Sequence, residues 1–418
     1  MKIIIIGAGP GGYETALEAA SRGIEVILVS EGPLGGTCLN EGCIPTKTFI
    51  NCSSLEEAQQ RKAEVVAQLR DGIGMLMKNK LITLVYGHGR LTGANTVDVD
   101  GTQYTADKVI IATGSTSADI PVPGKELAIS SKELLELKEL PKRLCIIGGG
   151  VIGLEFASIF ASYGSVVTVI EYCPNILPRF DIDIAKRLKQ LLSKKGITIE
   201  TSAQVCGIKP GFNVEWTRKG EQFSTEADLV LMAVGRKPAI EGLGLEEVGI
   251  ASTRRGITVD ENMQTSVPGV YAIGDANGGI MLAHVATYEG RRALNHICGV
   301  GDGIRFDVVP SAVFTKPELA TVGLTEEECK DRGIAFKALK SFYRANGKAV
   351  SMGETEGYCK ILAEEGSGRI LGCHILGAHS SDIIHEAAVL INLGATTMQA
   401  HDMIHAHPTL SEVFSGAL

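Results

Sequence analysis

Two stretches of the chain repeat one pattern of apolar and polar positions. Residues 2–31 and residues 143–171 each run from an apolar strand through a glycine-rich turn into a segment with helical spacing, then to a second apolar strand. Short apolar runs bounded by turns favour buried strands, and apolar positions every three to four residues favour a helix. The pattern therefore predicts two β–α–β units, each part of a parallel sheet.

Both repeats carry the spacing G-x-G-x-x-G between the first strand and the helix. In such a turn the glycines allow a tight bend, a close approach of a pyrophosphate and close packing of helix on strand. A plain connector between strand and helix is the alternative interpretation, and the duplication disfavours it. The chain is predicted to bind two dinucleotides, with these glycines at the two turns: Gly7, Gly9, Gly12, Gly148, Gly150 and Gly153.

The ends of the second strands indicate which dinucleotides bind. Glu171 closes the strand of the second copy, where a carboxylate accepts hydrogen bonds from a ribose and repels a 2′-phosphate, so this site is predicted to take NAD. We interpret Arg179 as a solvated loop residue. In the first copy Ser30 stands at the equivalent position and Glu31 follows it, and which of them contacts the ribose stays open.

Two further apolar strands end in tight turns. The stretch "VIIATGS" carries Thr113 and Gly114, and "VYAIGDA" carries Asp275, which is well placed to bind a polyol such as a ribityl chain. A Gly-Asp turn alone is common. Beside a dinucleotide fold and a pair of cysteines, it favours FAD in the first site.

The cysteine pair lies in "GGTCLNEGCIPTK", residues 35–47, where Cys38 and Cys43 are expected at the start of a helix. The field at a helix N-terminus favours a thiolate, which is the species that attacks disulfides. A zinc site with His405 and His407 is disfavoured by the spacing. A structural disulfide is disfavoured in a reducing compartment. The pair is therefore predicted to be oxidised and reduced in turn.

Composition limits the class of protein. The 418 residues suffice for about three domains, and 44% hydrophobic and 21% charged residues are ordinary for a globular protein. A net charge of −8 without a basic stripe argues against a nucleic-acid partner. No membrane span and no secretory signal are recognised, so a cytoplasmic location is expected.

These motifs together resemble the pyridine nucleotide–disulfide oxidoreductases over essentially the whole chain. The resemblance rests on the cysteine motif, both glycine turns, "ATG", "AVGRKP", "AIGDA" and the terminal "HAHPTLSE". It implies an α/β fold with two Rossmann-like domains, for FAD and NAD, and a C-terminal α+β dimerisation domain. The expected ranges are 1–140 with 237–305 for FAD, 141–236 for NAD and 306–418 for dimerisation.

The resemblance also implies roles for individual residues. Cys38 would exchange with substrate and Cys43 would face the flavin. His407 and Glu412 would form an acid–base pair that reaches the partner's active site in a homodimer. Lys47 and Glu155 would form an ion pair near the flavin, and Gly235 would lie at a cofactor.

Within this family the chain resembles the branch that oxidises dihydrolipoamide. This implies FAD-dependent oxidation of dihydrolipoyl groups by NAD⁺ through a Cys38–Cys43 disulfide, with a lipoyl-bearing protein of a 2-oxo acid dehydrogenase or glycine cleavage system acting in trans. Only about forty residues separate Lys47 from "GHGRL", fewer than is usual in the family. An NADH-dependent reductase of another small disulfide therefore stays open, as does a non-catalytic flavoprotein subunit.

Overall fold

The computed structural model describes all 418 residues, which divide into two compact units. Each unit is built from segments that are separated in sequence. Unit 1 comprises Met1–Ala118, Ser131–Glu136 and Gly235–Ile304. Unit 2 comprises Asp119–Ser130, Leu137–Val234 and Arg305–Leu418.

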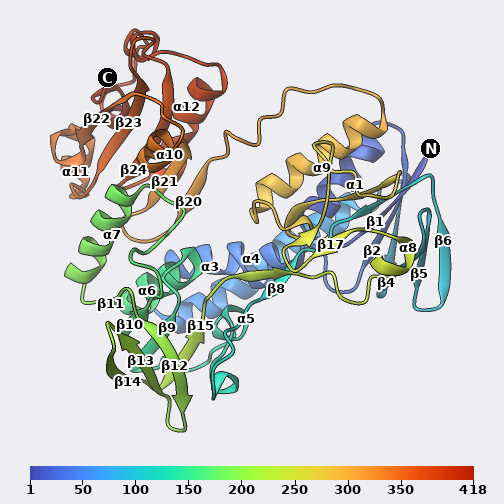
Figure 1. Ribbon diagram of the computed structural model, residues 1–418, viewed down its shortest axis with the longest axis horizontal. Helices are drawn as coiled ribbons and strands as arrows, with labels where there is room; N and C mark the ends of the chain where they lie inside the picture. Colours follow the sequence, from blue (N-terminus) through green and yellow to red (C-terminus); the bar gives the residue numbers. More distant parts are fainter. The chain divides into compact units, whose positions relative to one another are not determined.

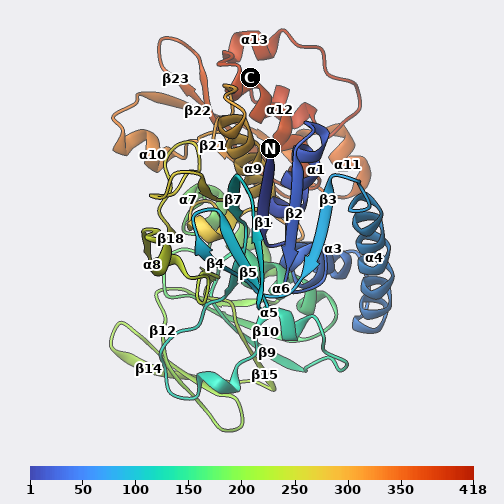
Figure 2. The same cartoon turned by 90° about the vertical axis from the view of Figure 1, so that its right-hand side faces the viewer.

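Unit 1 is centred on a five-stranded parallel sheet, part of which is seen face-on in Figure 2. Its central strand is a run of four isoleucines, buried because sheet neighbours and covering helices leave no face to water. Across the sheet the strands are β19 (Val270–Ala272), β7 (Lys108–Ile111), β1 (Lys2–Ile6), β2 (Glu25–Ser30) and β3 (Ile82–Tyr86).

Two helices far apart in sequence pack together beside this sheet, α1 (Pro10–Ser21) and α9 (Ala283–Ile297). Helix α1 begins with Pro10, whose missing N–H costs nothing at a helix start. At Gly290 of α9 an added Cβ would collide with the Thr15 side chain of α1. A residue without a side chain at this point therefore lets the two helices approach closely.

The remaining elements of unit 1 are short, apart from one 22-residue helix, α4. The Ser54 side chain caps α4 by accepting a hydrogen bond from the Glu57 N–H. The helices are α2 (Gly36–Glu41), α3 (Cys43–Ile50), α4 (Leu55–Leu76), α5 (Ser131–Leu134), α8 (Leu245–Val248) and η2 (Gly274–Asn277). The strands are β4 (Gly89–Gly93), β5 (Thr96–Val99), β6 (Thr102–Thr105), β8 (Ser115–Ser117), β16 (Arg236–Pro238), β17 (Ser252–Thr253) and β18 (Gly256–Ile257).

Unit 2 contains a second parallel sheet and an antiparallel three-stranded sheet packed on it. The parallel sheet has the order β11 (Thr198–Glu200), β10 (Val166–Ile170), β9 (Arg143–Ile147) and β15 (Leu229–Met232). The antiparallel sheet has the order β12 (Gln204–Lys209), β13 (Asn213–Arg218) and β14 (Glu221–Glu226). The helices of this part are η1 (Lys125–Leu127), α6 (Val151–Ser162) and α7 (Ile182–Lys194).

The C-terminal part of unit 2 is a five-stranded antiparallel sheet, drawn in orange and red in Figure 1. One face packs against α12, through an apolar core. The sheet order is β20 (Ser311–Val313), β21 (Leu319–Gly323), β24 (Ile370–Leu376), β23 (Tyr358–Glu364) and β22 (Phe336–Phe342). The helices are α10 (Glu326–Asp331), η3 (Tyr343–Ala345), α11 (Gly347–Met352), α12 (Ser380–Asn392), α13 (Thr397–His401) and α14 (Glu412–Ser415).

The predicted fold class is confirmed, with two Rossmann-like α/β arrangements followed by an α+β part. Strand β22 and helices α10 and α11 were not predicted, because alternating lysines and short polar helices give weak apolar periodicity. No helix combines the length and apolar character that crossing a membrane requires.

Candidate active site

The two cysteines lie on consecutive short helices of unit 1. Cys38 lies within α2, and Cys43 is the first residue of α3, with only Gly42 between the helices. The start of α2 packs on the first glycine turn, because a Cβ added to Gly36 would collide with the Cα of Gly9. The fold thus holds the thiol pair directly against the turn that was predicted to bind the flavin nucleotide.

The expected bias toward thiolate is not found at Cys38. A hydrogen bond with Cys43, burial and the negative charge of Cys43 raise the pKa of the Cys38 thiol, and Lys47 opposes this only in part. A helix N-terminus favours the thiolate of a residue in its first turn, and here that residue is Cys43 of α3. When both sulfurs are reduced, Cys38 is therefore the one that holds a proton.

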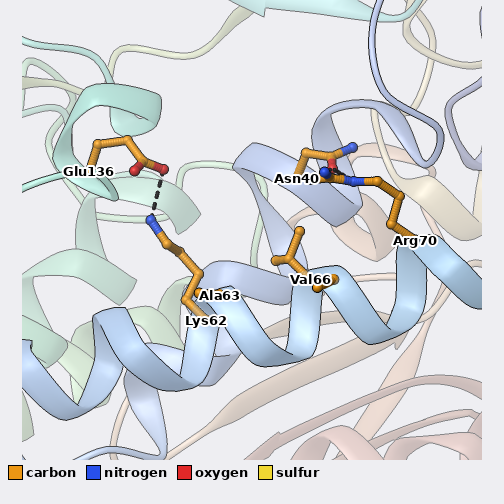
Figure 3. A pocket seen from close by; sticks show the side chains of 7 residues that line it. Asn40, Lys62, Ala63, Val66, Arg70 and Glu136 are labelled. Carbon is orange, nitrogen blue, oxygen red and sulfur yellow. Dashed lines mark hydrogen bonds and ion pairs between the residues drawn. The ribbon is translucent and has the colours of Figure 1, made fainter.

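One ion pair and two hydrogen bonds anchor the end of α2, and sequence patterns gave no signal for them. Arg70 of α4 donates from Nε (3.0 Å) and Nη2 (2.7 Å) to Oδ1 of Asn40. Glu41 pairs with Lys132 at 2.6 Å. Figure 3 shows the Arg70–Asn40 contact and the Lys62–Glu136 pair at a cavity of about 220 Å³, which is lined by residues of α2 and α4 and by Glu136. The contacts of Asn40 and Glu41 fix the segment that carries Cys38.

The first glycine turn has the shape that a dinucleotide needs. Gly7 has a φ of +109°, and a Cβ on Gly12 would collide with the Gly7 carbonyl. No atom lies within 4 Å of a Cβ built on Gly9, so this face of the turn is open to a ligand. The turn precedes α1, whose free N–H groups favour a pyrophosphate. These residues fit FAD.

The two residues considered for the ribose differ in what they already contact. The buried Ser30 hydroxyl donates a hydrogen bond of 2.8 Å to the Gly32 carbonyl. The Glu31 carboxylate is 77% exposed and lies 3.5 Å from Nδ1 of His88. Because the carboxylate has most of its hydrogen-bonding capacity left, the geometry favours Glu31 over Ser30 for a ribose.

Asp275 is held by two residues that the sequence analysis missed. The Ser115 hydroxyl donates to its carboxylate, and Arg236 donates to that hydroxyl (2.7 Å) and to the Ser115 carbonyl (2.6 Å). Thr113, two residues before Ser115, donates a hydrogen bond of 2.7 Å from its hydroxyl to the Ala239 carbonyl. Gly235, which directly precedes Arg236, has a φ of +122°. The predicted residues from three chain segments thus converge around one turn of unit 1.

Glu289 is a second carboxylate at this turn, and it is buried. It accepts hydrogen bonds from the Gly274 N–H (2.6 Å) and from Nδ2 of Asn277 (2.9 Å), so it holds the η2 turn that carries Asp275. Burial and the charge of Asp275 raise the pKa of Glu289 to about 7, against the lowering effect of these hydrogen bonds. Glu289 therefore takes up a proton on folding near neutral pH.

We expect Glu289→Gln to flatten the dependence of stability on pH. A carboxyl whose pKa is raised by folding contributes stability that is complete below the unfolded pKa and lost as pH rises through the folded pKa. From about 4.5 to about 7 this amounts to at most about 3 kcal/mol. Urea unfolding of the FAD-loaded protein at pH 5 to 8 measures it. The exposed Glu246→Gln is the control, and equal pH slopes in wild type and Glu289→Gln would contradict the assignment.

The second glycine turn, in unit 2, has the same geometry. Gly148 has a φ of +111°, a Cβ on Gly153 would collide with the Gly148 carbonyl, and Gly150 faces open space. The buried Glu171 accepts hydrogen bonds from the N–H groups of Gly149 and Cys173. These donors fix the carboxylate at the mouth of the turn, where it fits the ribose of NAD and repels an additional phosphate.

His407 and Glu412 are brought together as a pair. Nδ1 of His407 lies 2.9 Å from Oε1 of Glu412, and the Thr409 N–H donates to the other carboxylate oxygen at 2.8 Å. These contacts hold the pKa of Glu412 below its usual range. An ionised Glu412 accepts from Nδ1–H and leaves Nε2 of His407 as the basic nitrogen. The His407 side chain is 77% exposed, so that nitrogen is accessible.

The remaining predicted pair lies in different units. Lys47 is on α3 of unit 1, and the buried Glu155 is on α6 of unit 2, where its Oε1 accepts a hydrogen bond of 3.0 Å from the Phe314 N–H. The ion pair between Lys47 and Glu155 stays a prediction.

Comparison with known proteins covers the whole chain. Residues 1–290 match the pyridine nucleotide-disulphide oxidoreductase family, and residues 309–418 match the dimerisation domain of that family. Dihydrolipoyl dehydrogenase of Bacillus subtilis is 38% identical over 448 residues, covering 100% of this chain and 98% of the relative. The enzyme of the same name from Geobacillus stearothermophilus is 39% identical over 440 residues, covering 98% of this chain and 94% of the relative.

A solved structure of a flavoprotein disulfide reductase is also similar to this chain over its whole length. The HOCl-induced flavoprotein disulfide reductase RclA of Escherichia coli superposes with a TM-score of 0.92 at 32% identity, over 100% of this chain and 99% of that one. The match to a dimerisation domain supports a homodimer. The chain therefore belongs to the pyridine nucleotide-disulphide oxidoreductases, enzymes that use FAD and NAD.

Proposed function

We propose that this enzyme oxidises dihydrolipoyl groups with NAD⁺. The dithiol loses two electrons and two protons and becomes the cyclic disulfide, while NAD⁺ gains a hydride and one proton is released. The observation that carries the proposal is the combination of the Cys38/Cys43 pair with the His407–Glu412 pair in a chain 38–39% identical to dihydrolipoyl dehydrogenases.

The residues of the chain divide the proton and sulfur chemistry between them. Nε2 of His407, from the partner subunit of the homodimer, removes a proton from the substrate dithiol. The resulting thiolate attacks Sγ of Cys38, the Cys38–Cys43 bond breaks, and the second substrate sulfur then displaces Cys38. Glu412 keeps His407 in the required tautomer. FAD held at the first glycine turn would supply the redox chemistry that links the enzyme dithiol to NAD⁺.

The binding roles follow the geometry described above. We assign the first glycine turn, Glu31, Thr113, Asp275 and their neighbours to FAD, and the second glycine turn with Glu171 to NAD. We further propose that Lys47 and Glu155 pair near the flavin and that Gly235 lies at a cofactor. The domains proposed are 1–140 with 237–305 for FAD, 141–236 for NAD and 306–418 for dimerisation.

The biological setting is part of the same proposal. A lipoyl-bearing protein of a 2-oxo acid dehydrogenase or glycine cleavage system supplies the substrate in trans, and the enzyme acts in the cytoplasm. The names of the relatives support this substrate class.

Initial rates with dihydrolipoamide test the proposal, measured side by side with NAD⁺ and NADP⁺. Because Glu171 repels a 2′-phosphate, we expect NAD⁺ to be preferred by about 100-fold, equivalent to about 3 kcal/mol. A protein that binds FAD but does not reduce NAD⁺ with dihydrolipoamide would contradict the substrate assignment. A preference for NADP⁺ would contradict the role of Glu171.

A second candidate is an NADH-dependent reductase of another small disulfide. The alignment with the Bacillus subtilis relative exceeds the 418 residues of this chain by 30 positions, so at least that many residues of the relative have no counterpart here. The similarity to RclA also favours this candidate. Reduction of other disulfides by NADH, far faster than any reaction with lipoamide, would select it.

A further inference from the structure

A second histidine–carboxylate pair lies beside the first. Nε2 of His405 lies 2.6 Å from Oε1 of Glu386, which projects from α12. Nδ1 of His405 lies 3.1 Å from the backbone carbonyl of Met403. The His405 side chain is 12% exposed, in contrast to the open His407 two residues later.

The two partners of His405 fix its position. A backbone carbonyl only accepts hydrogen bonds, and so does an ionised carboxylate. Each of these acceptors lies within hydrogen-bond distance of one ring nitrogen, so Glu386 and the loop backbone hold the His405 imidazole in a fixed orientation. The contact between His405 and Glu386 follows no local sequence pattern, because Glu386 is 19 residues away.

His405 also acts electrostatically on Glu412 of the acid–base pair. The positive charge of His405 adds to the Thr409 N–H and His407 contacts that lower the pKa of Glu412. The adjoining segments also carry Glu386, His407 and the exposed Asp402, and the buried Cys373 thiol is under the electrostatic influence of Glu386. Among these, His405 is the group that joins the loop bearing His407 to helix α12.

We propose that His405, anchored by Glu386, is a positioning residue for His407 and Glu412. It ties the 403–408 loop to α12 and keeps Glu412 ionised, so that His407 presents Nε2 to the substrate. This inference rests on the proposed function for its kinetic consequences but not for the state of Glu412.

The kinetic test uses Glu386→Gln and His405→Gln in the FAD-loaded dimer. Because small displacements of a proton-transfer group are costly, we expect kcat/KM for dihydrolipoamide to fall about 10-fold in each, mainly through kcat. The two losses should not add, since the pair acts as one unit. In a His407→Gln background neither change should lower the rate further. The acidic limb of the pH profile should move to higher pH.

Two controls separate positioning from a structural defect. NADH-dependent ferricyanide reduction draws electrons from the flavin without the base, so it should stay unchanged in both variants. His401→Gln changes an exposed histidine of the same segment and should behave like wild type. Variants within twofold of wild type in kcat/KM, or a parallel loss of ferricyanide reduction, would overturn the proposal.

A titration that needs no substrate distinguishes this inference from the proposed function. Carboxyl ¹³C NMR of Glu412, assigned with Glu412→Gln, should show a higher pKa in His405→Gln and in Glu386→Gln than in wild type. If dihydrolipoamide is not a substrate but this shift is found, the positioning role stands and the proposed function fails. An unchanged pKa of Glu412 would overturn the positioning role itself.

Discussion

Cys38→Ser should abolish the oxidation of dihydrolipoamide by NAD⁺, with a loss of roughly 10⁴-fold or more. A serine oxygen cannot form the mixed disulfide, so the electron pair of the substrate has no covalent route to the enzyme. Hydrogen bonding with Cys43 makes Cys38 the sulfur that keeps its proton in the reduced pair. The initial rate with saturating NAD⁺ measures the loss.

The same variant should keep its flavin and its NADH-dependent ferricyanide reduction, because the two glycine turns do not depend on the cysteine. Cys206→Ser is the matched control, since Cys206 is exposed on β12 of unit 2. A Cys38→Ser protein with more than one hundredth of the wild-type rate would show that the pair is not the electron relay.

Lys360→Met should lower the free energy of unfolding by about 3–5 kcal/mol, because it leaves buried carboxylates without their cation. The Lys360 ammonium is fully buried and lies 2.8 Å from Asp181 and 2.6 Å from Glu326. Asp181 precedes α7 and is fully buried too, while Lys360 lies on β23 and Glu326 begins α10. Removing the ammonium therefore affects three elements of unit 2 at once.

The effect should depend on pH in a defined direction. Burial raises the pKa of Asp181, but His374 and Lys360 outweigh it and hold that pKa below its usual range. A depressed folded-state pKa contributes stability above the unfolded pKa that is lost as pH falls through the folded value. Wild type should therefore lose this contribution below about pH 4, and the difference between wild type and Lys360→Met should shrink there.

Urea unfolding of the FAD-loaded protein measures both effects. Lys340→Met is the matched control, since Lys340 pairs with Asp183 at 3.1 Å but is partly exposed, and it should cost less than about 1 kcal/mol. The double variant Lys360→Met with Asp181→Asn should be less destabilised than the sum of the single changes. A loss below 1 kcal/mol in Lys360→Met would contradict the buried charge network.

The sequence by itself determined the two dinucleotide turns, the cysteine pair and the fold class. These features depend on short-range rules: Gly7 and Gly148 have positive φ, which glycine tolerates without cost, and strand and helix periodicities repeat over a few residues. Glu171 was found for the same reason, because it follows directly from the end of a strand.

Only the tertiary structure decided which groups support these motifs. Ser115 and Arg236 are 121 residues apart, Asp181 and Lys360 179 apart, and Glu386 and His405 19 apart, and none of these pairs has a spacing that predicts contact. Which sulfur of the pair keeps its proton also depends on tertiary structure, because the hydrogen bond with Cys43 and burial raise the pKa of Cys38, whereas Cys43 is the residue at the start of a helix. Burial and long-range hydrogen bonding exist only once the chain has folded, so they cannot be predicted from local sequence patterns.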